Sequence, residues 1–161
     1  MSAGNRAVWF DKNHRDCTYV DVRPSVKPDI VADTRELPEA VGEGYGMVVF
    51  DPPHVNGGAN GNISRDYGHH TTDEIRDIIK RSAKEAWRVT LPDALMAFKW
   101  NDHDQKLGRV LALMPDWEPL FGHVTSTRAK HVCQTYWVML RRRDSRQSEV
   151  KQGDYIPCNN S

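Results

Sequence analysis

Apolar residues gather at 47–50 in the run Met-Val-Val-Phe, which no polar residue interrupts. A continuous apolar run rich in β-branched valine predicts a strand buried on both faces, like an inner strand of a parallel sheet. Pro52 and Pro53 end this strand, because proline has no amide hydrogen for the next ladder bond. Asp51 is therefore expected at the carboxyl end of the strand, which is the edge where open α/β sheets bind ligands.

Two earlier runs of residues also predict a strand with an acidic residue at or near its carboxyl end. Residues 18–23 and 30–32 are β-branched or aromatic at most apolar positions, and they predict two further strands. The first strand brings Asp21 to or near its carboxyl end, and the second is followed directly by Asp33. Together with Asp51, these residues place an acid at three predicted strand ends.

The second half of the chain predicts three more strands. Residues 94–100 form an apolar run that ends in Lys99 and Trp100, and we expect a second buried strand there. Residues 119–124 and 135–140 predict two closing strands.

Helical spacing of apolar residues marks two segments between these strands. Thr71 and Glu74 form a capping box, and apolar residues then recur on one helical face as far as about Val89. Residues 104–114 predict a second amphipathic helix, and Pro92 with Asp93 predicts a turn. The order of elements predicts an α/β fold with a mostly parallel sheet and an antiparallel C-terminal hairpin.

The length of 161 residues suits one domain with one core, which we place at residues 1–143. Residues 144–161 are polar and aperiodic and predict a disordered tail. The 22 basic residues balance the 22 acidic ones, so nucleic-acid binding would require a local patch such as Arg141–Arg143; the alternative is that this basic run is a solvated strand end.

The cysteines and the lengths of the apolar runs indicate in which cellular compartment the protein is expected. The three cysteines are scattered without C-x-x-C spacing, which argues against a disulfide framework and against a zinc site. No apolar run has the length of a signal peptide core or of a membrane span. We expect a soluble, cytoplasmic protein, with no membrane partner and no metal; its oligomeric state is left open.

Lys99 and Trp100, at the carboxyl end of their predicted strand, and two polar segments are expected to meet a substrate. Residues 55–70 are rich in Gly and Asn, include Asn56 and Tyr67, and predict a long surface loop that acts as a lid over the site. Residues 126–131 form a polar, basic loop that contains Arg128 and Lys130.

The motif D-P-P-H at residues 51–54, after a V-V-F strand, resembles the D-P-P-Y motif of S-adenosylmethionine-dependent amino methyltransferases. These enzymes methylate exocyclic nitrogens of nucleic-acid bases. The wider series W-F-D-K-N-H, Y-V-D-V-R-P, I-V-A-D-T-R-E-L-P, V-V-F-D-P-P-H and F-K-W-N is similar to a group of small methyltransferases common in phages and prophages. The resemblance covers residues 4–143 and implies a Rossmann-like methyltransferase fold, S-adenosylmethionine as cofactor and DNA or RNA as partner, with DNA adenine favoured.

The resemblance also implies roles for single residues in cofactor binding. Asp21 matches the acid that accepts hydrogen bonds from both ribose hydroxyls of the cofactor. Asp33 matches the acid that takes the adenine amino group, with the Thr34 amide available to a ring nitrogen. For both acids the alternative is a strand-end surface residue.

In the same family pattern, Asp51 accepts one hydrogen of the target amino group and the Pro52 carbonyl accepts the other. The nitrogen lone pair is thereby drawn out of conjugation and aimed at the methyl carbon, so catalysis is mainly orientation. Pro53 holds Pro52 extended. His54 takes the place of an aromatic residue that stacks on the base, and Trp100 or Tyr67 could compensate for its weaker stacking.

The chain departs from the family pattern at its start. Related enzymes begin with a strand and a Gly-rich turn against the methionine part of the cofactor, whereas only Ala3, Gly4 and Asn5 match that turn here. The missing strand would lie beside the strand that carries Asp51, so its loss would expose two strand edges. We expect that the encoded protein starts further upstream; the alternative is a reduced form with weak or no cofactor binding.

Other functions stay open at this point. The histidines suggest a metal enzyme, but no pair has the spacing of known ligand motifs. A non-catalytic binding module is the second alternative, supported by the missing strand. Within the enzyme class, RNA, a small molecule or a protein amide could replace DNA as substrate.

Overall fold

A computed structural model describes residues 1–54, 70–127 and 134–144. Its main sheet has four strands in the order β3–β4–β6–β5, which are β3 (Tyr45–Phe50), β4 (Thr90–Asn101), β6 (Gln134–Arg142) and β5 (Trp117–Thr127). β3 pairs in parallel with β4, and β6 pairs antiparallel with both β4 and β5. The predicted antiparallel hairpin at the end of the domain is therefore confirmed.

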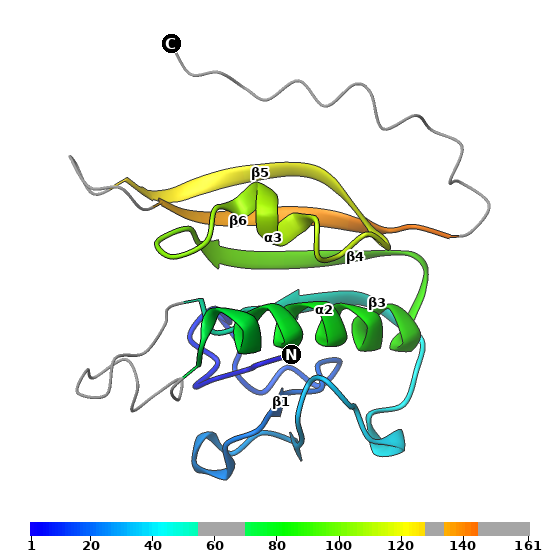
Figure 1. Ribbon diagram of the computed structural model, residues 1–161. Helices are drawn as coiled ribbons and strands as arrows, with labels where there is room; N and C mark the ends of the chain where they lie inside the picture. Colours follow the sequence, from blue (N-terminus) through cyan, green and yellow to red (C-terminus); the bar gives the residue numbers. More distant parts are fainter. Residues whose placement is uncertain (55–69, 128–133, 145–161) are drawn as a thin grey trace.

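A second, two-stranded parallel sheet lies below β3 in Figure 1 and consists of β1 (Val20–Asp21) and β2 (Ile30–Val31). Short 3-10 helices follow each strand, η1 (Pro24–Val26) and η2 (Glu39–Val41). With two parallel and two antiparallel pairings, the described strands form a more mixed arrangement than the mostly parallel sheet predicted from sequence.

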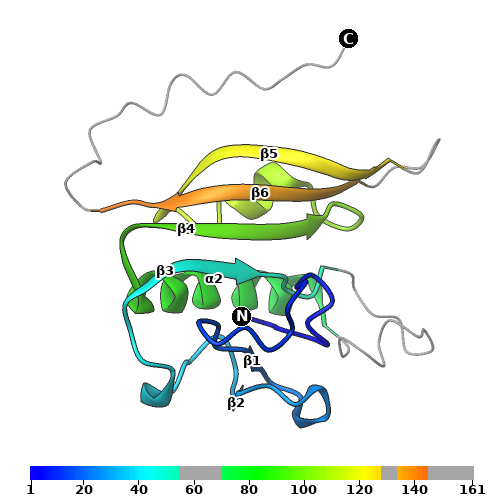
Figure 2. The ribbon, with the colours of Figure 1, turned by 180° about the vertical axis from the view of Figure 1, so that it is seen from behind.

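The helices α2 (Thr72–Val89) and α3 (Leu107–Leu111) lie on the same face of the four-stranded sheet (Figures 1 and 2). The main hydrophobic core lies between these helices and the four-stranded sheet. Its largest fully buried side chains include Trp100, Trp117, Phe50, Phe98, Ile75 and Ile79. No helix in the described parts of the chain is both long enough and apolar enough to cross a bilayer.

The start of α2 follows the sequence prediction closely. The Glu74 amide donates to the Thr71 hydroxyl at 3.2 Å, and the Thr71 amide donates to the Glu74 carboxylate at 2.6 Å. This reciprocal pair satisfies two amide groups that the first helical turn leaves without partners. The predicted capping box and the predicted end at Val89 are both confirmed.

Three predicted elements differ from the structure. The strand at residues 18–23 narrows to Val20–Asp21, because its partner β2 offers only two residues to pair with. The helix at residues 104–114 narrows to α3. The turn at Pro92 and Asp93 is instead an irregularity within β4, where Asp93 has φ of 59° and the register with β3 shifts. A β-bulge tolerates both a proline and a residue with a left-handed backbone conformation, so β4 continues through Pro92 and Asp93.

β3 is not buried on both faces as predicted. Phe50 and Val48 are buried, but Met47 is 49% exposed. β4 covers one edge of β3, and no strand among the described residues pairs with the other edge. The open edge borders the site described below.

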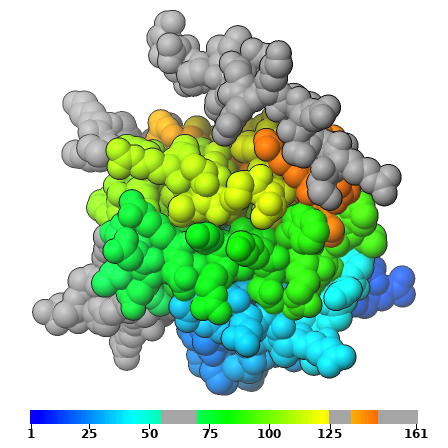
Figure 3. Space-filling view, turned by 45° about the vertical axis from the view of Figure 1, so that its right-hand side comes forward, coloured from blue at the N-terminus to red at the C-terminus, as the bar shows by residue number. Residues whose placement is uncertain are grey.

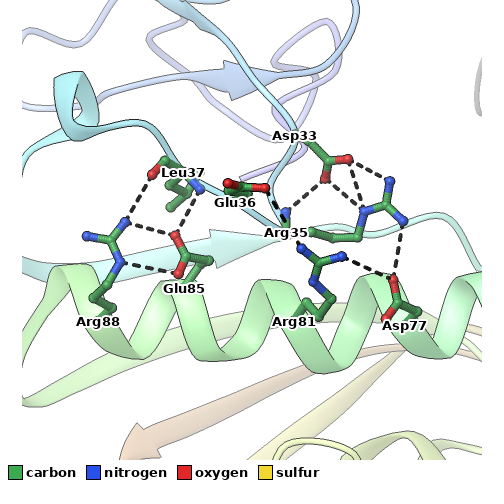
Figure 4. Close-up of polar contacts among 8 residues, drawn as sticks. All are labelled: Asp33, Arg35, Glu36, Leu37, Asp77, Arg81, Glu85 and Arg88. Atoms are coloured by element: carbon green, nitrogen blue, oxygen red, sulfur yellow. Dashed lines mark hydrogen bonds and ion pairs between the residues drawn. The ribbon is translucent and has the colours of Figure 1, made fainter.

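Ion pairs fasten the segment after β2 to α2 (Figure 4). Figure 3 shows the neighbourhood of residues 25–50, blue to cyan, lying directly against the green surface of α2. The Leu37 amide donates to the Glu85 carboxylate at 2.8 Å, while Arg88 donates to the Leu37 carbonyl at 3.1 Å and pairs with Glu85 at 2.8 Å. The Arg88 guanidinium holds the pKa of Glu85 below its usual value.

We expect Glu85→Gln to lower the free energy of unfolding by about 1–2 kcal/mol, because the acceptor of the Leu37 amide loses its charge and the ion pair with Arg88 is removed. Urea denaturation measures this change. The stabilisation is present above the ordinary glutamate pKa of 4.5 and is lost as the pH falls below it, since the folded-state pKa is lowered.

Glu36→Gln is the matched control for this variant. The Glu36 carboxylate is 89% exposed and lies 4.0 Å from Arg81. Its replacement should change stability by less than about 0.5 kcal/mol. Equal losses from the two variants would contradict the assignment of Glu85 as the main fastening residue.

Candidate functional site

A cavity of about 710 Å³ lies between the β1–β2 sheet and the open edge of β3. Volumes of about 300–1,000 Å³ are typical of small-molecule sites. The cavity lining includes many of the residues that the sequence singles out, namely Gly4, Asn5, Asp21, Asp33, Thr34, Asp51, Pro53 and Lys99. The acids from three strand ends are thus brought to one pocket. Pro52, His54 and Trp100 are not part of its lining.

The first residues of the chain bridge the two sheets at this cavity. The Met1 amino group donates to the Val49 carbonyl at 2.8 Å, and the Ala3 amide donates to the Val20 carbonyl at 2.9 Å. Burial lowers the pKa of the Met1 amino group to about 6. Within the described residues, no strand lies between β1 and β3, in agreement with the two open edges expected from the sequence.

Asp21 ends β1 with its side chain buried. Its carboxylate accepts bonds from the Gly4 amide at 2.8 Å and from the Arg23 amide at 2.9 Å and Nε at 3.1 Å. Burial alone would raise the pKa of Asp21, but these bonds lower it. A ligand hydroxyl would have to share this carboxylate with Arg23, because a carboxylate has about four acceptor positions.

Asp33 repeats this arrangement two residues after the end of β2. Its carboxylate accepts bonds from the Arg35 amide at 2.9 Å and from the Arg35 guanidinium at 2.6 Å. The Arg35 contact lowers the pKa of Asp33. Arg35 also reaches Asp77 on α2 at 3.2 Å (Figure 4). The Thr34 hydroxyl is buried and bonds with the Ser82 hydroxyl at 2.8 Å, which fixes the loop that carries both residues.

Asp51 directly follows β3 and pairs with Lys99. The Lys99 ammonium donates to Asp51 Oδ2 at 2.7 Å. The other oxygen, Oδ1, is buried and has no hydrogen-bond partner among the described residues. An anionic oxygen in this state is costly unless a donor reaches it, so it marks a position where a ligand donor would be stabilised.

His54 contacts Pro52 and Trp100, and none of the three residues lines the cavity. The His54 ring approaches the Pro52 carbonyl through Nδ1 at 3.3 Å and meets the edge of Trp100 with ring centroids 6.1 Å apart. Burial lowers the pKa of His54, which favours the neutral imidazole. The Pro52 carbonyl, expected to accept an amino hydrogen, already faces this ring.

Trp100 does not offer a substrate surface, contrary to the prediction. Its side chain is fully buried, and its indole donates to the Gln105 carbonyl at 2.8 Å. Side chains alternate along a strand, so Trp100 points into the core while its neighbour Lys99 points to the cavity. The predicted substrate residues Asn56, Tyr67, Arg128 and Lys130 lie outside the described residues.

Two features of the site were not anticipated from the sequence. Trp9 lines the cavity and makes an edge contact with Tyr19, with ring centroids 5.4 Å apart. The arginines that hold Asp21 and Asp33 each lie two residues after the acid. The repeated D-x-R spacing is a signal that could have revealed these pairs.

Comparisons with known proteins show the fold. No protein-family model matches the chain, and no curated protein sequence matches it. The structure is similar to that of the N-methyltransferase NodS from Bradyrhizobium japonicum WM9 in complex with S-adenosyl-L-homocysteine, with a TM-score of 0.51 and 11% identity. That match covers 78% of this chain and 65% of the NodS chain, which is less than two thirds of its length. A further NodS structure matches at a TM-score of 0.48 and 9% identity, over 78% of this chain and 72% of that chain. The predicted α/β, Rossmann-like methyltransferase fold is confirmed.

Proposed function

We propose that this chain is an S-adenosylmethionine-dependent N-methyltransferase that acts on an exocyclic amino nitrogen of a nucleic-acid base, with DNA adenine as the favoured substrate. The observation that carries the proposal is Asp51, which follows β3, precedes two prolines and lines the cavity. Its buried Oδ1 has no hydrogen-bond partner among the described residues. The D-P-P-H motif supports an amino group as the target. The fold likeness to NodS, itself an N-methyltransferase, is compatible with this chemistry.

The volume of the cavity suits S-adenosylmethionine. This volume of about 710 Å³ lies in the range of small-molecule sites, and acids line the cavity from three strand ends. Asp21 and Asp33 would hold the nucleoside part of the cofactor. Both acids already hold an arginine, so we expect each arginine to yield part of its contact when the cofactor binds.

The reaction itself requires little beyond placement. When bound, S-adenosylmethionine supplies a methyl group on a cationic sulfur: the nitrogen–carbon bond forms as the carbon–sulfur bond breaks, its electron pair stays on sulfur, and the nitrogen releases a proton to water. Asp51 Oδ1 would accept one hydrogen of the target amino group and so aim the nitrogen lone pair. Orientation of this kind accounts for a large part of many enzymatic rate accelerations.

A cofactor-impaired or non-catalytic binding module is the second candidate. The open edge of β3 and the arginines on Asp21 and Asp33 favour it, since both reduce the contacts available to a cofactor. Within the enzyme class, RNA, a small molecule or a protein amide would present the same conjugated nitrogen to Asp51.

One experiment separates these candidates. The chain is incubated with methyl-labelled S-adenosylmethionine and, in parallel, with DNA, RNA, protein and small-molecule fractions of a cell lysate. Binding of the cofactor is measured by calorimetry on the same preparation. We expect heat on titration and label in the DNA fraction. Label in another fraction would redirect the substrate, and no heat with S-adenosylmethionine would favour the binding module.

A further inference from the structure

The strand register places Lys99 beside Asp51. β3 and β4 run in parallel with Phe50 opposite Phe98, so the next positions along the two strands are Asp51 and Lys99. Both phenylalanines are fully buried in the core. Because side chains alternate along a strand, the following pair points to the other face, where the cavity lies. The contact between Lys99 and Asp51 is therefore a consequence of the sheet itself.

The ion pair leaves the two carboxylate oxygens in different states. Lys99 Nζ lies 2.7 Å from Asp51 Oδ2, whereas Oδ1 has no partner among the described residues. Both side chains are mostly shielded from solvent, at 26% exposed for Lys99 and 19% for Asp51. A short, shielded ion pair holds a carboxylate in one orientation better than a solvated pair does.

We propose that Lys99 is a positioning residue for methyl transfer: it holds Asp51 through Oδ2 and thereby reserves Oδ1 for the target amino group. This inference rests on the proposed function, and it adds a residue that the D-P-P-H motif does not contain. Lys99 acts on Asp51 and leaves the cofactor contacts at Asp21 and Asp33 unchanged. Its removal should affect the rate of transfer rather than the binding of either ligand.

The test compares Lys99→Met, which keeps most of the length of the side chain and removes the charge, with Lys99→Arg, which keeps the charge. Transfer is followed from labelled S-adenosylmethionine to the lysate fraction that wild-type protein labels. For Lys99→Met we expect kcat to fall about ten- to hundredfold, the effect of misplacing a reacting group by about 1 Å. KM and the Kd for S-adenosylmethionine should stay within about twofold. Lys99→Arg should restore most of the rate.

Lys80→Met is the matched control, because Lys80 is exposed on α2 and does not line the cavity. It should leave kcat unchanged. If wild-type protein transfers methyl groups and Lys99→Met does so at an equal or higher rate, Lys99 merely occupies the acceptor and the inference is overturned. A rise in KM with unchanged kcat would overturn it as well, by making Lys99 a substrate contact.

A second measurement does not depend on activity. The carboxyl 13C signal of Asp51 reports the surroundings of its two oxygens in the cofactor-free chain. We expect this signal to move in Lys99→Met, to return in Lys99→Arg and to stay in place in Lys80→Met. An unmoved signal in Lys99→Met would refute the positioning role. Absence of transfer by wild-type protein would instead count against the proposed function, so the two failures are distinguishable.

Discussion

Replacing Asp51 with alanine is expected to reduce methyl transfer at least about a hundredfold, the usual cost of losing a group that stabilises the transition state directly. The physical reason is that no other carboxylate pairs with Lys99 or directly follows β3 among the described residues. Affinity for S-adenosylmethionine should change little, since Asp21 and Asp33 supply the nucleoside contacts in the proposed arrangement. Single-turnover rates and calorimetric titration of the same preparation separate the two effects.

Asp73→Asn is the control for this loss. The Asp73 side chain is 92% exposed at the start of α2, and among the described residues its only ion pair is with Arg76 on the same helix. It should retain wild-type transfer. We expect Asp51→Ala to fold, because Lys99 is partly exposed and can extend its ammonium toward water. Thermal unfolding of the variant checks this. Retained transfer in a folded Asp51→Ala variant would remove the proposed mechanism.

The elements predicted most accurately from sequence are those with local signals. The capping box at Thr71 and Glu74 and the apolar face of α2 lie within one segment of chain, so a pattern of neighbours is enough. β1 and β2 are shorter than the strands predicted at residues 18–23 and 30–32, but Asp51 and the two prolines directly after it placed the end of β3 correctly. Each of these features depends on residues a few positions apart.

Features that depend on pairing between distant segments were not predictable in the same way. The Lys99–Asp51 ion pair joins residues 48 positions apart and requires the register of β3 on β4. The burial of Trp100 depends on the same register, because one step along a strand reverses the face of every side chain. Pro92 and Asp93 read as a turn in isolation, but pairing of the flanking residues with β3 carries the strand through them.

The open edge of β3 connects the fold to the proposed function. Met1 and Ala3 already bond to one carbonyl on β3 and to one on β1, so they lie in the groove that the cavity forms between these strands. Residues 45–49 line the cavity on one side of this groove, and residues 18–21 line it on the other. Met47 is exposed on the open edge. An extended segment joined to Met1 and running parallel to β3 would find partners on both sides.

An engineered six-residue valine- and isoleucine-rich segment joined before Met1 is therefore expected to stabilise the chain. New ladder bonds and burial of its side chains should together exceed the entropy of ordering the segment by about 2 kcal/mol, which corresponds to a rise in Tm of about 4–8 °C at this size. Hydrogen exchange should slow at β1 and at residues 45–49.

A Gly-Ser extension of equal length is the control. It distinguishes the effect of forming a new strand from the effect of removing the terminal charge. Both extensions remove the buried amino group of Met1, whose pKa burial lowers from its ordinary value of 8.0 to about 6. The unfolded chain binds more protons between these values, so the stability of the original chain should rise as the pH increases from 6 to 8. Both extended chains should lose this dependence, whereas only the apolar extension should slow exchange along β3. Equal protection from the Gly-Ser segment would show that the charge, and not a strand-shaped groove, governs this edge of the sheet.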